Sequence, residues 1–201
     1  DVNPQPAARE MDLIMACGEI ISGVVLTAQL NSRGIPAHFL TGEQAGIVTD
    51  DQYNNAHIKY INPKNILACL KEGLVPVVAG FQGRAENGEL TTLGRGGSDT
   101  TASALGVALH AEVVEIFTDV EGVMTADPRI VENARLLDDI TYNEICQLAR
   151  DGAKVIHPRA VEIAMQSGIP LRVRSTFSDS PGTLITHQNF GRQDAVSIIR
   201  D

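Results

Sequence analysis

The chain has 201 residues, of which 43% are hydrophobic and 20% are charged, a balance typical of one globular domain. A formal net charge of −9 argues against nucleic-acid binding, which usually needs a basic patch. No uninterrupted apolar run approaches the roughly 18 residues of a membrane span. The three cysteines lack metal-ligand spacing, which predicts small buried side chains in a reducing, cytoplasmic compartment.

Hydrophobic periodicity predicts a helix over residues 7–32, which is followed by short strands at 37–40 and 57–61. The next predicted helix starts near Pro63 and ends at Gly73. A buried strand (75–80), a polar loop (84–89) and a glycine-rich turn (94–97) follow, and then a helix with Ser98 as N-cap (98–109). The remaining predicted elements are a strand (112–118), a long loop (119–139), two helices (142–150 and 155–167) and two strands (169–173 and 182–185). This alternation predicts an α/β fold with a mainly parallel sheet.

The strongest local signal is the run TTLGRGGSDTT at residues 91–101, between a strand and a helix. Its glycines let an anion approach the backbone, and the helix start presents free N–H groups and a positive dipole end. Arg95 lies in this turn, where a guanidinium can grip a carboxylate with two hydrogen bonds. The run is neither a Walker A loop nor a dinucleotide fingerprint, and a glycine-rich turn without a ligand is the alternative interpretation.

Three other segments carry residues suited to binding. Residues 117–129 follow a strand and combine an apolar wall for a base with Arg129 for phosphate, although a solvated loop has the same composition. Lys154 near a helix start either meets an anion or is an exposed surface lysine, and His157 before Pro158 is expected to cap or pack. Glu19, beside a glycine in an apolar helix, could pair with an ammonium group or lie on the helix surface.

Together these segments resemble aspartokinases, within the amino acid kinase family, over residues 7 to about 186. The motifs that carry the resemblance occur in the family's order: TTLGRGGSD, then TDVEGVMTADPR, GAKVIHP, and IPLRVRST with a following Gly-Thr. The resemblance implies a three-layer α/β/α sandwich over residues 1–186 and a linker at 187–201 toward a regulatory region.

The resemblance also implies roles for single residues. Arg95 would hold a carboxylate of aspartate, Glu19 its ammonium group, and Asp99 would orient groups around the transferred phosphoryl. Phe81 and Ser98 would line the aspartate pocket. The ATP site, with Mg²⁺ on the nucleotide, would be formed by Thr118, Asp119, Met124, Arg129 and Lys154.

The implied reaction transfers the γ-phosphoryl group of ATP to the side-chain carboxylate of aspartate, at the entry to lysine, diaminopimelate, threonine and methionine synthesis. The family's Lys-Phe-Gly-Gly-Thr-Ser loop and its C-terminal ACT domains are not found in this sequence. We therefore expect this chain alone to have little kinase activity. The resemblance also implies a homo-oligomer, with a regulatory ACT-domain subunit as a further candidate partner. The alternatives are a kinase of the same fold that acts on another carboxylate, and a non-catalytic binding or assembly fragment.

Overall fold

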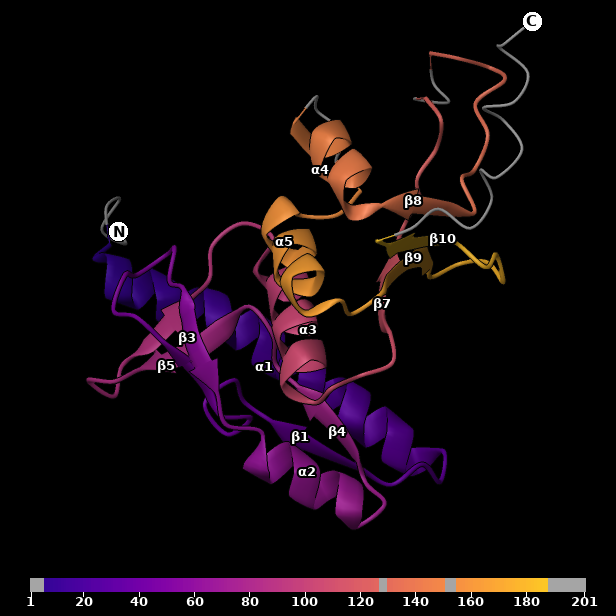
Figure 1. Ribbon diagram of the computed structural model, residues 1–201. Coiled ribbons are helices and arrows are strands. Elements are labelled where there is room, and N and C mark those ends of the chain that lie inside the picture. Colours follow the sequence, from indigo (N-terminus) through magenta and orange to yellow (C-terminus); the bar gives the residue numbers. More distant parts are fainter. Residues whose placement is uncertain (1–5, 127–129, 151–154, 188–201) are drawn as a thin grey trace, which may run out of the picture. The chain divides into compact units, whose positions relative to one another are not determined.

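The computed structural model describes residues 6–126, 130–150 and 155–187 (Figure 1). The chain divides into two compact units, Asp1–Thr101 and Ala102–Asp201, with the division inside helix α3 (Gly97–Ala108). Helices and strands occur in both units, and parallel strand pairs occur in both. The predicted α/β class is confirmed.

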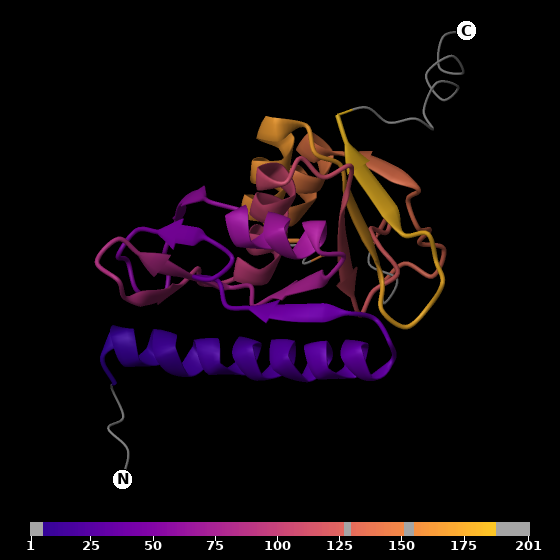
Figure 2. The ribbon, with the colours of Figure 1, turned by 90° about the horizontal axis from the view of Figure 1, so that it is seen from below.

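The first unit places a long helix against strands. Helix α1 (Ala8–Ser32) contacts β1 (Ala37–Leu40), β4 (Val75–Val78) and β6 (Leu90–Thr92), and Figure 2 shows it running beside β1. Strands β1 and β4 pair in parallel, and helix α2 (Lys64–Lys71) packs on β4. The other sheet has the order β3-β2-β5-β6, with β2 at Ile47–Thr49, β3 at Ile58–Ile61 and β5 at Gln82–Ala85.

Helix α1 buries one face and exposes apolar side chains on the other. Asp12, Ala16 and Gly23 are buried, whereas Ile14, Ile21 and Val25 are more than 60% exposed. By length and composition α1 could cross a membrane, although polar residues interrupt its apolar runs as the sequence indicated. One such helix does not by itself indicate a membrane protein, because core helices pass the same test.

The polar segment 84–89 was predicted as a loop, and this prediction was wrong in part. Gln82–Ala85 is strand β5, which pairs antiparallel with β6 across a turn in which Gly88 has a φ of 92°. β5 also pairs in parallel with β2, which was not predicted. Cys17 was expected to be buried and is exposed on α1, while Cys69 is buried.

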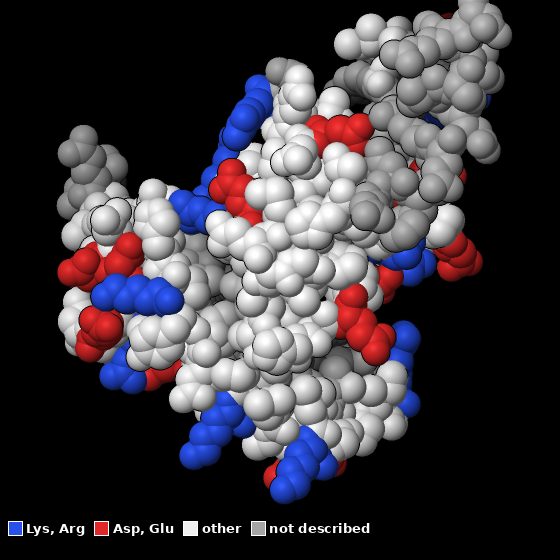
Figure 3. All heavy atoms as spheres, viewed as in Figure 1, with Lys and Arg blue, Asp and Glu red and all other residues white. Residues whose placement is uncertain are grey.

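The described Lys and Arg side chains do not form a continuous patch on the face shown in Figure 3. They alternate with acidic side chains, and several are paired with them, as Lys59 is with Glu86 at 3.1 Å and Arg84 with Glu43. Exposed pairs of this kind contribute little to stability.

The second unit is a four-stranded sheet covered by helices. Its strand order is β7-β9-β10-β8, with bounds Val114–Thr118, Leu171–Ser175, Thr183–Thr186 and Asp139–Thr141. Helices α4 (Tyr142–Arg150) and α5 (Pro158–Ser167) pack against each other. Alanine and valine side chains of α5 and alternate residues of β7 and β9 form the core: Ile116, Ala160, Val161, Ala164, Leu171 and Val173.

Helix α5 starts at Pro158, three residues later than predicted. A residue before proline avoids helical backbone angles, and His157 accordingly has extended ones (φ −75°, ψ 132°). His157 Nδ1 accepts a hydrogen bond from the backbone N–H of Arg159 at 3.3 Å. The predicted capping role of His157 is therefore confirmed.

Tyr142 is expected to make folding stability depend on pH at the alkaline end. The side chain is 2% exposed, and its hydroxyl donates a hydrogen bond to the Ile169 carbonyl at 2.7 Å. Burial raises the pKa of Tyr142 above its usual value of 10.0. The folded state thus holds the phenol proton more tightly than the unfolded state, so this stabilisation is fully present below about pH 10 and is lost as pH rises through the raised pKa.

Urea unfolding from about pH 8 to about pH 11 would measure this loss. Tyr142→Phe should flatten the fall in unfolding free energy at alkaline pH. Tyr60→Phe, at a side chain that is 56% exposed, is the matched control and should keep the parental slope. Equal slopes for Tyr142→Phe and the parent would contradict the prediction.

Candidate functional site

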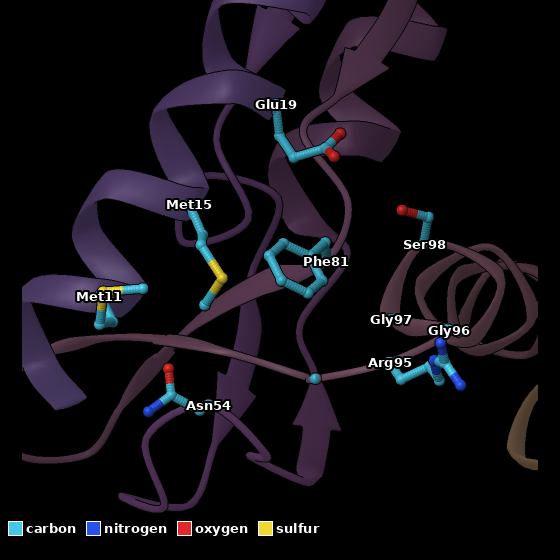
Figure 4. Close-up of a pocket in the computed structure, with 10 residues that line it drawn as sticks. Met11, Met15, Glu19, Asn54, Phe81, Arg95, Gly96, Gly97 and Ser98 are labelled. Atoms are coloured by element: carbon cyan, nitrogen blue, oxygen red, sulfur yellow. The ribbon is translucent and has the colours of Figure 1, made fainter.

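A pocket of about 560 Å³ lies in the first unit, between α1 and the glycine-rich turn that leads into α3 (Figure 4). Its lining residues are Met11, Met15, Glu19, Asn54, Phe81 and residues 94–98. Four side chains singled out from the sequence (Glu19, Phe81, Arg95 and Ser98) therefore meet around one cavity, although they come from three separate segments.

The turn takes its shape from glycines at positions that a side chain would obstruct. Gly94 has a φ of 71°, and a Cβ there would lie 2.7 Å from the Asn54 carbonyl oxygen. A Cβ on Gly97 would lie 2.7 Å from Cδ2 of Phe81. These close approaches bring the Asn54 loop and the Phe81 ring against the start of α3, and so form two walls of the pocket.

Phe81 has a φ of 67°, a left-handed conformation that is strained for a bulky residue. Hydrogen bonds on both sides hold it there. Its N–H donates to Thr101 Oγ1 at 2.9 Å, and its carbonyl accepts from the Leu93 N–H at 2.9 Å. The Thr101 hydroxyl in turn donates to the Gly97 carbonyl at 2.7 Å, so the strained residue is tied to the first turn of α3.

The polar groups of the pocket have opposite charges. In Figure 4 the Glu19 carboxylate and the Ser98 hydroxyl point toward one another, with the Phe81 ring beside them. The Arg95 side chain is exposed, and its guanidinium extends away from Phe81. The pocket thus offers a carboxylate, a hydroxyl, a long cationic side chain and the N–H groups of a helix start. These groups suit a small ligand that carries an ammonium group and carboxylates.

Several residues that build this pocket were not predicted from the sequence. Met11, Met15 and Asn54 line it, and the buried Asp12 carboxylate lies behind it and binds Thr92 and Asn54. A signal for Asp12 was present, because it shares one face of α1 with Ala16, Glu19 and Gly23 at helical spacing. An acidic residue on a face that packs against strands needs hydrogen-bond partners.

The other predicted site residues are distributed as follows. Asp99 lies in the first turn of α3, next to the pocket but not among its lining residues. Thr118 ends β7 and donates a hydrogen bond to Asp119 at 3.2 Å, and the half-buried Met124 forms an isolated bridge with Leu136. Arg129 and Lys154 lie outside the described residues. Thr118, Asp119 and Met124 all belong to the second unit.

The loop after β7 is anchored by a residue that sequence analysis did not identify. The buried Thr183 Oγ1 on β10 accepts a hydrogen bond from the Val123 N–H at 2.9 Å and donates to the Leu137 carbonyl at 2.6 Å. One hydroxyl thus joins both arms of the loop that carries Met124.

Thr183→Val is expected to lower the unfolding free energy by about 1–3 kcal/mol, because it leaves two buried backbone groups without their partner. Amide hydrogen exchange should become faster at Val123, whose N–H donates to Thr183. Thr183→Ser keeps the hydroxyl and is the matched control, with near-parental exchange. Unchanged exchange at Val123 in the valine variant would show that the hydroxyl does not anchor the loop.

The chain is similar in sequence to bacterial aspartokinases. Aspartokinase 1 of Bacillus subtilis is 59% identical over 178 residues, which are 89% of this chain and 44% of that protein. An aspartokinase of Geobacillus stearothermophilus is 49% identical over 187 residues, 93% of this chain and 46% of that protein. The chain therefore spans less than half the length of these curated relatives.

Solved structures agree with these matches. Escherichia coli aspartokinase III in complex with aspartate and ADP has a TM-score of 0.85 and 34% identity, covering 94% of this chain and 43% of that one. UMP kinase from Bacillus anthracis, at 19% identity and a TM-score of 0.65, shares the fold. The model of the amino acid kinase family matches residues 2–175. With that match over most of its length, the chain belongs to the amino acid kinase family.

Proposed function

We propose that this chain forms the aspartate-binding part, and a portion of the nucleotide site, of an ATP-dependent aspartate kinase. The enzyme would transfer the γ-phosphoryl group of ATP to the side-chain carboxylate of L-aspartate and release 4-phospho-L-aspartate. The observation that carries the proposal is the meeting of Glu19, Arg95 and Ser98 around one pocket at the start of a helix. Relatives named as aspartokinases, at 49% identity and above, support the same substrate.

The ammonium group and one carboxylate of aspartate have suitable counterparts in the pocket. Glu19 would hold the ammonium group, and Arg95 would hold a carboxylate with two parallel hydrogen bonds. Ser98 and the Phe81 ring would fix the orientation of the substrate between them. Asp99, one residue after Ser98, would orient groups near the reacting carboxylate. No side chain needs to act as a covalent nucleophile, since phosphoryl transfer depends on positioning and charge stabilisation.

ATP would bind through Thr118, Asp119, Met124, Arg129 and Lys154. In the described parts of the chain, no three His, Cys, Asp or Glu side chains gather into a group that could hold a metal ion. Mg²⁺ bound with ATP would accordingly be held mainly by phosphate oxygens and water, as is usual for this ion. It would neutralise negative charge on the phosphates during transfer.

The proposal extends to the natural protein as a whole. Residues 1–186 would be the catalytic domain and 187–201 a linker to a regulatory region. The protein would act in the cytoplasm, early in lysine, diaminopimelate, threonine and methionine synthesis. It would be a homo-oligomer, and a regulatory ACT-domain subunit is a candidate partner.

An amino acid panel tests the function directly. Calorimetry on the natural protein at full length would measure binding of L-aspartate, L-glutamate and N-acetyl-L-glutamate, and an ADP-release assay would measure turnover with each. We expect binding and turnover with aspartate, and weakened binding in Glu19→Gln because the ammonium group loses its charged partner. Turnover only with another carboxylate would indicate a different kinase of this fold, and binding without turnover would indicate a non-catalytic subunit.

A further inference from the structure

Asp12 is a buried carboxylate whose hydrogen bonds converge on the walls of the pocket. Its side chain is 0% exposed. Oδ1 accepts a hydrogen bond from the Asn54 N–H at 2.9 Å and one from Thr92 Oγ1 at 2.7 Å. Oδ2 accepts one from the Thr92 N–H at 2.8 Å. Two backbone groups and one hydroxyl are thus held by a single side chain of α1.

The three segments that Asp12 joins are the segments that enclose the pocket. On α1 it stands beside Met11 and two helical turns before Glu19. Asn54 is itself a lining residue, with a φ of 64°, and its carbonyl closely approaches Gly94. Thr92 ends β6, two residues before Gly94, where the turn that carries Arg95 begins.

Packing alone does not explain a carboxylate at this position. The same face of α1 meets the strands through Ala16 and Gly23, which need no polar partners. A buried carboxylate loses its hydration and is tolerated only with several well-aligned donors. The carboxylate adds a constraint on geometry that apolar contacts do not provide. Hydrogen bonds weaken steeply when the positions of donor and acceptor change, whereas apolar contacts do not.

We propose that Asp12 is a positioning residue of the ligand pocket. It fixes the distance between the α1 wall, which carries Glu19, and the glycine-rich turn, which carries Arg95. Asp12 does not line the pocket and acts through Asn54 and Thr92. The identity of the ligand as aspartate rests on the proposed function, and the role of Asp12 extends that function to the residue that sets the spacing of the two charged groups.

Asp12→Asn tests the proposal with the smallest change in shape. Asparagine keeps one acceptor oxygen, but its NH₂ group must face an N–H or O–H donor of Asn54 or Thr92, so one wall is released. In the natural protein at full length we expect the KM and the calorimetric Kd for aspartate to rise about tenfold or more. A shift of about 1 Å between Glu19 and Arg95 would weaken their simultaneous contacts with the ammonium group and the carboxylate of the substrate. The KM for ATP should change less than about twofold, and Asp12→Ala should show a larger rise for aspartate than Asp12→Asn.

Thr49→Val is the matched control. Thr49 lies on the same sheet as Thr92, and its buried hydroxyl forms a hydrogen bond with Thr91 Oγ1 at 2.6 Å. The valine variant therefore also loses a buried hydrogen bond, but neither of the two residues lines the pocket. It should lower the melting temperature and leave the ratio of the two KM values unchanged.

The outcomes separate the two proposals. An Asp12→Asn protein with the parental Kd for aspartate, or with KM values for aspartate and ATP raised equally, would overturn the positioning role and leave the proposed function intact. A parent protein that does not bind aspartate would overturn both. A selective rise for aspartate in the Asp12 variants, absent from Thr49→Val, is the expected result.

Discussion

Arg95→Ala is expected to lower kcat/KM for aspartate by about 10²–10³-fold in the natural full-length protein. The replacement leaves a carboxylate of the bound substrate without its charged partner, and losing one side of such a pair costs about 3–4 kcal/mol. The KM for ATP should change little, because in the proposed site Arg95 holds a carboxylate of aspartate and is not one of the nucleotide-binding residues. A coupled ADP-release assay with each substrate varied in turn measures both constants.

Arg95→Lys separates charge from geometry. Lysine keeps the positive charge but cannot form two parallel hydrogen bonds to a carboxylate, so we expect an intermediate kcat/KM. Lysine and alanine variants that are equally impaired would mean that the bidentate contact carries the whole effect. An alanine variant with the parental KM for aspartate would exclude Arg95 from the substrate site.

Gly97→Ala is expected to have the second largest effect. The new methyl group would lie 2.7 Å from Cδ2 of Phe81 and 3.0 Å from Cβ of Leu93. Phe81 cannot yield easily, since hydrogen bonds to Thr101 and Leu93 hold its strained backbone. We expect a loss of about 1–3 kcal/mol in unfolding free energy and a raised KM for aspartate, measured by urea unfolding and the kinetic assay.

Gly18→Ala makes the same chemical change where space is open, because beyond the adjacent backbone of α1 no atom lies within 4 Å of a Cβ built at Gly18. Gly18 is inside α1, and alanine there should raise the unfolding free energy by about 0.5–1 kcal/mol through its better helix propensity. The two alanine variants should therefore move stability in opposite directions. A stabilised Gly97→Ala protein would show that the turn has room to relax.

The helices could be predicted from the sequence more completely than the strands. The predicted bounds of α4 are those of the structure, and those of α1 differ by one residue, because apolar periodicity within one segment reports a helix face. Strand β5 has the sequence QGRA, without β-branched or aromatic residues. It is a strand because β2 and β6 lie on either side of it, and such pairing is not visible in a local pattern.

Some residues of the candidate site could likewise be predicted from the sequence and others could not. Glu19 and Arg95 could be singled out because each is a charged residue in a distinctive local pattern, whereas Phe81 and Ser98 were expected at the site only from the resemblance to aspartokinases. Met11, Met15 and Asn54 could not be predicted, because they belong to the pocket only through contacts between distant segments. Thr183 was missed for the same reason, since its partner Val123 lies 60 positions away in the sequence.

The bonds of Asp12 have a consequence for the order in which the first unit folds. The hydrogen bonds from Thr92 to Asp12 span 80 residues, and the bond from the Gln82 side chain to the Ala16 carbonyl spans 66. Closing such long loops costs chain entropy before any contact rewards it, and contacts of high sequence separation form slowly. During synthesis, α1 leaves the ribosome well before the turn at residues 94–97 that completes its cavity. The pocket is accordingly among the last parts of this unit to form, and until residue 92 has been made Asp12 lacks two of its hydrogen bonds.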